Sequence, residues 1–279
     1  MNLLETRRML EHMADDAGVI NGARKARYIF EHYTGLSSED VYRMGDDYLL
    51  QGWKTAVLVR AVKRLISGVP VQLILGYTHF YADIFLCRKG VMIPRPETET
   101  LVDIAVAELD AMGGTRRILD LFTGSGIIAI SLARARPGHR YFGADKSRKA
   151  INLARENSGR LGTDVEWRVG NMFAPFANEP EGFDIICANP PYIPASELKR
   201  LPLDVRTGDP MDALDGGKDG LRFHKRLAHE AGEWFKPGGR LIVEMGYDQR
   251  KAIGGLFKPR KVRFAKDLWG KDRVYVVSY

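Results

Sequence analysis

Ile118-Leu119-Asp120-Leu121-Phe122-Thr123-Gly124-Ser125-Gly126 is the segment from which the fold of this chain is best predicted. Residues 118–121 have the apolar pattern of a short strand, and residues 127–136 have the apolar spacing of a helix. The glycines between them permit a tight turn and let backbone amides approach a ligand without interference from a Cβ atom. The segment therefore predicts a strand, a ligand-binding loop and a helix.

An acidic residue follows the next predicted strand, residues 140–144. Asp145 comes about 20 residues after Gly126, where a carboxylate can accept hydrogen bonds from both hydroxyls of a ribose. The loop lacks the third glycine of the dinucleotide fingerprint, and it has no Gly-Lys-Ser/Thr, so a P-loop is excluded. The strand, the loop and the acid together favour an adenosine-type cofactor.

Strand and helix patterns alternate beyond this segment. Helices are predicted at 101–109 and 147–157, and strands at 165–169, 183–188, 240–245, 262–265 and 273–278. Alternation of this kind favours an α/β fold, in which a mostly parallel sheet carries helices on both faces.

The N-terminal part has a different character. Apolar residues recur at helical spacing up to about residue 68, which indicates a small helical bundle. Short aromatic-rich runs at 76–81 and 84–87 then suggest a β-hairpin. We therefore predict a helical domain at residues 1–70, a linking β-hairpin at 71–93 and an α/β domain at 94–279.

A second loop, Asn189-Pro190-Pro191-Tyr192, follows the buried-strand pattern at 183–188. Open α/β sheets bind ligands in the crevice beyond the carboxyl ends of their strands. The two prolines stiffen the loop and carry no N–H donor. Its polar groups are then the Asn189 side chain and the carbonyls of Asn189 and Pro190, which suit a planar NH2 group with two hydrogens to donate. Tyr192 offers a ring face or a hydroxyl beside the same group.

The rigid acceptors suit methyl transfer to a planar nitrogen. An amide or exocyclic amine is a weak nucleophile because its lone pair is delocalised. Two fixed acceptors can hold both hydrogens and aim the nitrogen at a methyl group, so that positioning and electrostatics supply most of the rate effect. Proton loss can follow attack.

Composition sets limits on the remaining functional classes. The chain has 279 residues, of which 45% are hydrophobic, so a disordered protein is excluded. Two cysteines cannot build a disulfide framework, and no His or Cys spacing is typical of a metal site, so no metal is expected. No apolar run has the length of a membrane span or of a signal peptide, and we expect a cytoplasmic protein, with a monomer as our interpretation. The net charge of +7 is dispersed, and it is as compatible with solvated surfaces as with nucleic acid.

The motifs together resemble the HemK/PrmC family. The loop around Gly124 resembles motif I of S-adenosylmethionine-dependent methyltransferases, in which an acid, here Asp120, precedes the glycines. The similarity covers almost the whole chain and is sharpest from residue 70 to 247. Besides the two loops, it is carried by Pro70-Val71-Gln72, Gly76, Phe80, Ile93-Pro94-Arg95-Pro96-Glu97-Thr98-Glu99, Asp212 to Leu221, and Pro237-Gly238-Gly239 before a strand ending in Glu244.

The resemblance implies a fold and an activity. The α/β domain would be a Rossmann-like class I methyltransferase sheet that uses S-adenosyl-L-methionine. Members of this family methylate the glutamine amide in the Gly-Gly-Gln motif of class I peptide chain release factors, and by this resemblance the N-terminal domain would help to recognise the release factor.

The resemblance also implies a set of site residues. Asp120 would lie near the methionine end of the cofactor, Asp145 would bind the ribose, and Asn171 with Met172 would lie beside adenine. Asn189, Pro190, Pro191 and Tyr192 would grip the substrate amide, with Asn189, Pro190 and Tyr192 as the catalytic set and Asn189 also beside the cofactor. Arg95 and Glu97 would form part of the pocket wall. The residues expected to line the cofactor in the glycine loop are Phe122, Thr123, Gly124, Ser125 and Gly126.

Two departures and three alternatives accompany this interpretation. Phe122 stands where the family usually has Gly or Cys, and Asn171 replaces a frequent Asp.

Methylation of an exocyclic amine in DNA or RNA poses the same geometric problem, but the N-terminal residues are mixed in charge, and no stable nucleic-acid binding is expected. A sister branch methylates a glutamine of a large-subunit ribosomal protein, and its usual text lacks the Pro-Glu-Thr-Glu found at 96–99. A cofactor-binding scaffold without catalysis is disfavoured by the intact tetrapeptide at 189–192.

Overall fold

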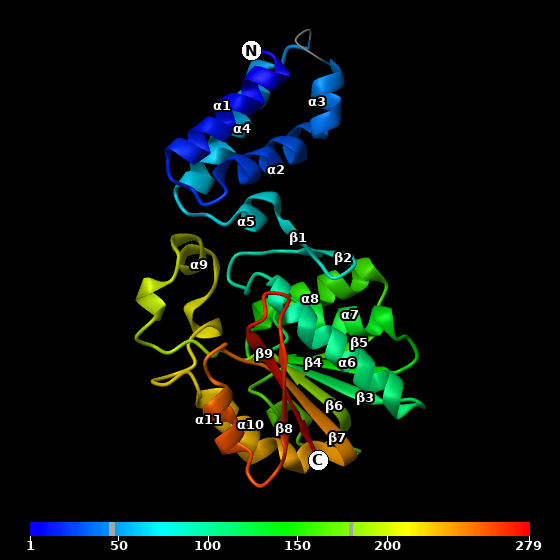
Figure 1. Ribbon diagram of the computed structural model, residues 1–279. Coiled ribbons are helices and arrows are strands. Elements are labelled where there is room, and N and C mark those ends of the chain that lie inside the picture. Colours follow the sequence, from blue (N-terminus) through cyan, green and yellow to red (C-terminus); the bar gives the residue numbers. More distant parts are fainter. Residues whose placement is uncertain (45–47, 179–180) are drawn as a thin grey trace. The chain divides into compact units, whose positions relative to one another are not determined.

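The computed structural model describes residues 1–44, 48–178 and 181–279 (Figure 1). Its contacts divide the chain into one unit of Met1–Tyr77 with Pro202–Gly208, and a second unit of Thr78–Leu201 with Asp209–Tyr279. Each unit has its own hydrophobic core. Within the described residues, no helix has the length and apolar character required to cross a membrane.

The first unit is helical, as the N-terminal spacing predicts. A capping box starts its first helix, because the Asn2 side chain accepts from the Glu5 amide and the Glu5 side chain accepts from the Asn2 amide. The side chains of Leu10, Phe30 and Val62 meet in its core with no exposed surface. The helices of this unit are α1 (Leu3–Asp16), α2 (Gly22–Thr34), α3 (Ser38–Met44), α4 (Gly52–Ile66), α5 (Val71–Leu75) and α9 (Leu203–Gly208).

The second unit is built on a seven-stranded sheet with the order β5-β4-β3-β6-β7-β9-β8. Strands β3 to β7 pair in parallel, and β9 runs antiparallel to both of its neighbours. A separate hairpin joins β1 (Tyr77–Phe80) and β2 (Asp83–Leu86). The strands of the large sheet are β3 (Arg117–Leu121), β4 (Arg140–Asp145), β5 (Val165–Val169), β6 (Phe183–Ala188), β7 (Phe235–Glu244), β8 (Val262–Lys266) and β9 (Asp272–Ser278).

Helices cover both faces of this sheet (Figure 1). Successive residues of β3 face opposite sides of the sheet and are both buried, since Ile118 packs into one apolar cluster and Leu119 into the other. Three helices contribute to the first cluster, namely α6 (Glu99–Met112), α7 (Ile127–Ala135) and α8 (Arg148–Leu161). The second cluster includes side chains of α10 (Arg222–Glu230) and α11 (Arg250–Leu256). Short 3₁₀ helices lie at η1 (Pro96–Thr98), η2 (Ala174–Phe176), η3 (Leu198–Arg200), η4 (Met211–Ala213) and η5 (Ala231–Trp234).

The predicted α/β sheet with helices on both faces is thus confirmed. Strand β3 has β4 on one side and β6 on the other, so the strand order reverses at β3. Ligands of open α/β sheets bind beyond the carboxyl ends of strands at such a reversal. The glycine loop follows β3 and the Asn-Pro-Pro-Tyr loop follows β6, which places both loops at this crevice.

Candidate active site

The glycine loop after β3 has an unusual backbone. Phe122 has a φ of 59°, in the left-handed region that favours glycine. Gly126 has a φ of 85°, and a Cβ atom there would come within 2.9 Å of the Ile130 and Trp167 side chains. The loop therefore needs glycine at 126 to keep the helix that follows close to the sheet, whereas at 122 it tolerates a strained aromatic residue.

Asp145 at the end of β4 organises the loop from the other side. Its Oδ2 accepts a hydrogen bond from the Gly124 amide at 3.0 Å, and its Oδ1 accepts one from the Ser147 amide at 2.8 Å. Burial raises the pKa of this carboxyl, although both amide bonds favour the charged form. Each carboxylate oxygen has a second lone pair, so the group can also accept from the two hydroxyls of a ribose.

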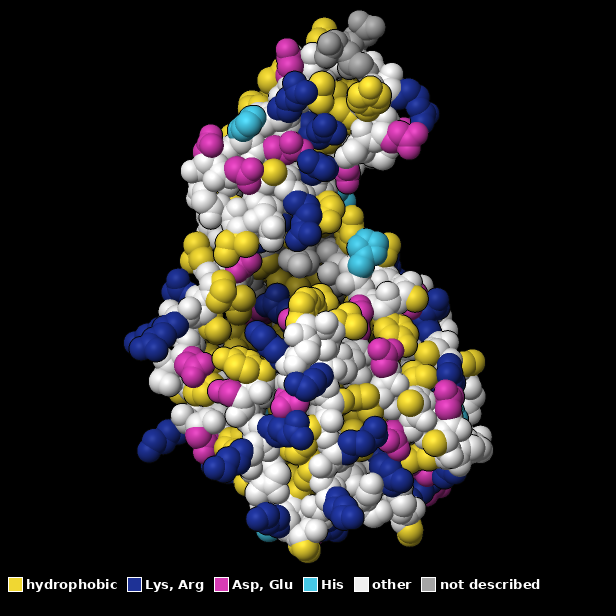
Figure 2. Space-filling view, viewed as in Figure 1, with side chains coloured by type: hydrophobic (Ala, Val, Ile, Leu, Met, Phe, Trp, Pro, Cys, Tyr) yellow, Lys and Arg dark blue, Asp and Glu magenta, His cyan; other side chains and the backbone are white. Residues whose placement is uncertain are grey.

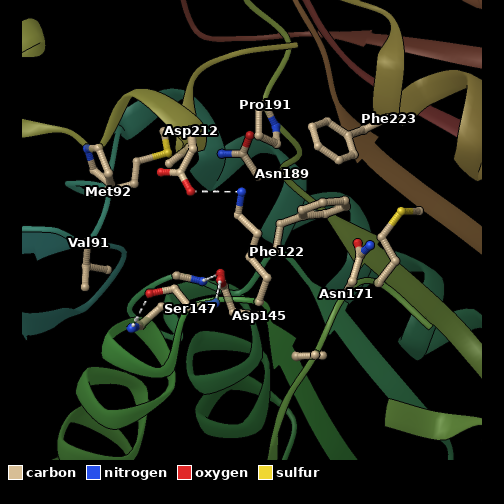
Figure 3. A pocket seen from close by; sticks show the side chains of 18 of the residues that line it. Val91, Met92, Phe122, Asp145, Ser147, Asn171, Asn189, Pro191, Asp212 and Phe223 are labelled. Carbon is tan, nitrogen blue, oxygen red and sulfur yellow. Dashed lines mark hydrogen bonds and ion pairs between the residues drawn. The ribbon is translucent and has the colours of Figure 1, made fainter. Parts of the chain in front are cut away.

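A cavity lies beyond these strand ends (Figure 3). The space between its lining atoms is about 740 Å³, including the open mouth. Figure 3 shows the side chains of Asn189, Phe122 and Asp212 converging on it from three segments of the chain. Its lining includes Met92, Phe122, Gly124, Asp145, Asn171, Met172, Asn189, Pro191 and Phe223.

The wall expected beside adenine is present, but one of its polar atoms is already hydrogen-bonded. Asn171 and Met172 both line the cavity, and Met172 has a φ of 52°. The Asn171 Oδ1 accepts a hydrogen bond from the Arg226 guanidinium at 3.2 Å, so the NH2 group of the same side chain remains to donate to a ligand. The ring of Phe122 packs edge-on against the ring of Phe223, with centroids 5.1 Å apart.

An ion pair connects two sides of the cavity. The Lys146 Nζ lies 2.9 Å from the Asp212 carboxylate, and both residues line the pocket (Figure 3). Both side chains are more than half exposed, so the pair contributes little to stability. Neither residue is predictable as a site residue from sequence, because one follows β4 and the other lies 66 positions later.

Asp120 lies under the glycine loop and is fully buried. Its Oδ2 accepts hydrogen bonds from the Thr123 hydroxyl and from the Ala129 amide, whereas its Oδ1 has no partner among the described residues. Burial raises the pKa of this carboxyl to about 7. It lines neither this cavity nor its smaller neighbour, so its effect on a ligand would be electrostatic. A positively charged ligand beyond the loop would lower the free-energy cost of its ionised form.

The Asn-Pro-Pro-Tyr loop is tied into a chain of hydrogen bonds. The Asn189 Nδ2 lies 3.2 Å from the Thr98 hydroxyl, which in turn lies 2.6 Å from the Glu244 Oε2. The Tyr192 hydroxyl donates to the other carboxylate oxygen of Glu244 at 3.0 Å. Burial raises the pKa of Glu244, while the hydrogen bonds from Thr98 and Tyr192 oppose that shift. Tyr192 lines neither of the two cavities at the site, and its hydroxyl proton is already engaged by Glu244.

The segment before α6 lines a smaller adjacent cavity. Arg95, Thr98, Thr123 and Ser125 belong to its wall, and it shares Asn189 with the larger one. Arg95 forms an ion pair with the buried Asp209, whose other oxygen accepts from the Ile93 amide at 2.8 Å. Glu97 is half-buried and lines neither cavity, although its charge acts on Glu244 and Tyr192.

Four groups at the site are not among the residues predicted from sequence: Thr98, Glu244, Phe223 and the Lys146–Asp212 pair. Thr98 and Glu244 occur in the motifs that carry the family resemblance, but nothing in their spacing indicates that they meet. In the part of the chain that the structure describes, no group of three or more His, Cys, Asp or Glu side chains could hold a metal ion.

Comparison with known proteins gives two family matches. The PrmC N-terminal domain matches residues 5–76, and a methyltransferase domain matches residues 114–263. The release factor glutamine methyltransferase of Thermodesulfovibrio yellowstonii is 36% identical over 260 residues, covering 91% of this chain and 92% of that protein. The protein of the same name from Bacteroides thetaiotaomicron is 37% identical over 249 residues, covering 88% of each.

Solved structures give similar matches. The release-factor-specific protein-(glutamine-N5) methyltransferase of Alicyclobacillus acidocaldarius shares 30% identity over 67% of this chain and 93% of its own, with a TM-score of 0.43. A 16S rRNA methyltransferase of Thermus thermophilus, solved with AdoMet and guanosine, has a TM-score of 0.52 at 17% identity, over 72% of this chain and 49% of that one. At that identity the second likeness shows the fold alone.

Proposed function

This chain belongs to the family of release factor glutamine methyltransferases, and from that premise we propose that it methylates the glutamine of the Gly-Gly-Gln motif in class I peptide chain release factors. The methyl donor is S-adenosyl-L-methionine and the product is N5-methylglutamine. A protein substrate of this kind would place the enzyme in the cytoplasm, where translation ends. The proposal includes a monomer that binds no nucleic acid stably.

One observation supports the proposal above the others, namely that Asp145 and Asn189 line the same cavity. An acid that suits a ribose and an amide that suits a planar NH2 group therefore face one space. When bound, S-adenosylmethionine supplies an electrophilic methyl group on a positively charged sulfur. The residues present fit such a ligand, since Asp145 keeps free lone pairs and the unpartnered oxygen of Asp120 lies beneath the loop.

The residues of the second loop would hold the nucleophile. The Asn189 Oδ1 and the Pro190 carbonyl are acceptors, and together they can engage both hydrogens of the glutamine NH2 group. Fixing the plane of the amide points its nitrogen in one direction, and this removes the orientational freedom that a glutamine side chain has in water. The ring of Tyr192 would pack beside the amide and limit water access. The nitrogen becomes strongly acidic once it is alkylated, so no strong base is needed before attack.

The other pocket residues would hold the donor. Asp145 would accept from the ribose hydroxyls, and Asn171 and Met172 would contact adenine. The glycine loop from Phe122 to Gly126 would pass along the methionine part, with Asp120 acting on its positive charge from below. Arg95, held by Asp209, would form part of the wall on the substrate side. We propose no contact for Glu97 beyond its charge.

The proposal can be tested with labelled S-adenosylmethionine and three acceptors. These are a purified class I release factor, the same factor with its Gly-Gly-Gln glutamine replaced by alanine, and bulk DNA or RNA. The Asn189→Ala variant serves as the enzyme control, checked for unchanged unfolding temperature. We expect label on the intact factor alone and a loss of at least a hundredfold with Asn189→Ala, since positioning supplies most of the rate.

The other outcomes distinguish the alternatives. Label on nucleic acid would show that the loop holds a base amine and that the proposal is wrong. Figure 2 already shows acidic side chains interspersed among Lys and Arg on the visible face of the second unit, which does not suit a continuous nucleic-acid groove. No label on any acceptor would leave a ribosomal-protein substrate, which the same assay can test with purified large-subunit proteins.

A further inference from the structure

The buried carboxylate of Glu244 fixes the direction of two hydrogen bonds. Glu244 ends β7 and is 1% exposed, with one oxygen bonded to the Thr98 hydroxyl at 2.6 Å and the other to the Tyr192 hydroxyl at 3.0 Å. A carboxylate accepts hydrogen bonds and has none to give. Both hydroxyls must therefore donate their single protons to Glu244.

The consequence for Asn189 follows from the Thr98 hydroxyl. Having given its proton to Glu244, the Thr98 oxygen can only accept from its remaining neighbour. That neighbour is the Asn189 side chain at 3.2 Å, so the amide must present its NH2 group to Thr98. The Asn189 Oδ1 then points away from Thr98 and has no partner among the described residues. Rotation of the amide by 180° would place two acceptors against each other.

We propose that Thr98 and Glu244 are positioning residues that hold the oxygen of the Asn189 amide toward the substrate. This inference depends on the proposed function, because it assigns the freed oxygen to the NH2 group of a glutamine. In the rotated state, an NH2 group would face the substrate NH2 group, and two donors cannot bond. Neither Thr98 nor Glu244 needs to touch the substrate.

The test compares Thr98→Val, which keeps the side-chain shape without a hydroxyl, with Thr98→Ser, which keeps the hydroxyl. Methylation of a release factor is measured under single-turnover conditions with enzyme in excess, so that slow variants can be followed. We expect Thr98→Val to lower the rate about tenfold to a hundredfold and Thr98→Ser to stay within about threefold of the parent. The affinity for S-adenosylmethionine should be unchanged in both.

A second background separates positioning from general structural support. Asn189→Asp has the same shape but two equivalent oxygens, so no amide remains to be oriented. Thr98→Val should then lower the rate by no more than about twofold in the Asn189→Asp background. Equal losses in both backgrounds would overturn the proposal, as would a Thr98→Val enzyme with the parent rate. A parent enzyme that methylates no release factor would instead refute the proposed function.

A different observation supports a second inference. The turn between β8 and β9 exposes two large apolar side chains, Leu268 at 85% and Trp269 at 59%. The turn is nevertheless fixed, because the Asp267 carboxylate accepts from the amides of Trp269 and Lys271, each at 3.0 Å. A fixed, exposed tryptophan is a frequent anchor of protein interfaces.

This turn lies at the same end of the sheet as the active site, namely the end at which the parallel strands have their carboxyl termini. Strand β9 is antiparallel to β7, so its first residues lie beside the end of β7, with Val274 opposite Glu244. Arg273 joins the two places, since its Nε bonds the Asp267 carboxylate at 3.1 Å and its charge acts on Glu244. A protein that delivers a glutamine to Asn189 must approach this end of the sheet.

We infer that Leu268 and Trp269 form a docking surface for the protein substrate of the proposed function. Trp269→Ala and Leu268→Ala should each raise the KM for an intact release factor about tenfold and leave kcat unchanged, while Trp269→Tyr keeps an aromatic anchor and most of the affinity. A KM equal to that of the parent would overturn the inference. So would a parent dimer in sedimentation that Trp269→Ala dissociates, because the surface would then bind a second copy.

Discussion

At the residue scale, Asp145 connects loop geometry to cofactor binding. Asp145→Ala removes the proposed acceptor for the ribose, and we expect affinity for S-adenosylmethionine to fall at least about a hundredfold, as for two lost hydrogen bonds to a charged group. Calorimetric titration with S-adenosylmethionine measures this affinity directly. Ser147→Ala is the control, because it removes the hydroxyl that caps α8 and leaves the carboxylate in place. The control should lower the free energy of unfolding by about 1 kcal/mol and leave affinity unchanged.

Asp120 makes the stability of the chain depend on pH. Burial raises the pKa of its carboxyl from 3.8 to about 7, so the folded state binds a proton more tightly than the unfolded state. Its contribution to stability is therefore fully present below pH 3.8 and is lost as the pH rises through about 7. We expect Asp120→Asn to flatten the fall in unfolding free energy between these values, measured by urea unfolding without cofactor. A parent and variant whose pH profiles stay parallel would contradict this assignment.

Single residues also show what the sequence can and cannot indicate about the site. Asp145 and Asn189 are predictable because each directly follows a recognisable strand, and parallel strands end at one edge. Thr98 is not predictable, because its two partners lie 91 and 146 positions away. The positive φ of Phe122 is likewise invisible in a side-chain pattern that contains no glycine at that position.

At the element scale, the β3–α7 connection depends on Gly126. Gly126→Ala adds a methyl group within 2.9 Å of Ile130 and Trp167 at a φ of 85°, so we expect both strain and overpacking. The unfolding free energy should fall by about 2–4 kcal/mol, measured by urea unfolding. Gly138→Ala is the matched control, since its φ is 92° and no atom of the described residues lies within 4 Å of the new methyl group. If the two variants lost equal stability, the contacts of Gly126 would have no role.

Strand β7 shows why some element bounds differ from prediction. The sequence predicts a strand at 240–245, because Pro237, Gly238 and Gly239 are typical of a turn. The structure extends β7 back to Phe235. Tyr279 explains the difference, since its carbonyl accepts from the Gly238 amide and its amide donates to the Gly239 carbonyl, each at 3.0 Å. Pairing with the C-terminus thus overrides the local preference, and local sequence carries no sign of it.

At the scale of the whole molecule, the chain returns once to its first unit. Helix α9 lies far along the sequence, yet the Thr207 hydroxyl donates to the Gly68 carbonyl and the Lys25 Nζ lies 3.5 Å from the Asp204 carboxylate. Leu203 packs directly over Gly68, where a Cβ atom would come within 2.6 Å of it. No periodicity in residues 202–208 predicts this, because the contacts join segments more than 130 positions apart.

Removing Met1–Tyr77 tests what the first unit contributes. The shortened chain keeps the sheet, both loops and every residue that lines the larger cavity, so we expect affinity for S-adenosylmethionine within about threefold of the parent. It loses the helices that we expect to help recognise the release factor, so the KM for that protein should rise at least about tenfold, while kcat at saturation changes little. Steady-state methylation over a range of release-factor concentrations separates the two constants. Because the deletion removes the contacts of α9 with Lys25 and Gly68, Leu203→Ser in the shortened chain serves as a control for aggregation. Unchanged turnover at low release-factor concentration would show that the second unit alone recognises its substrate.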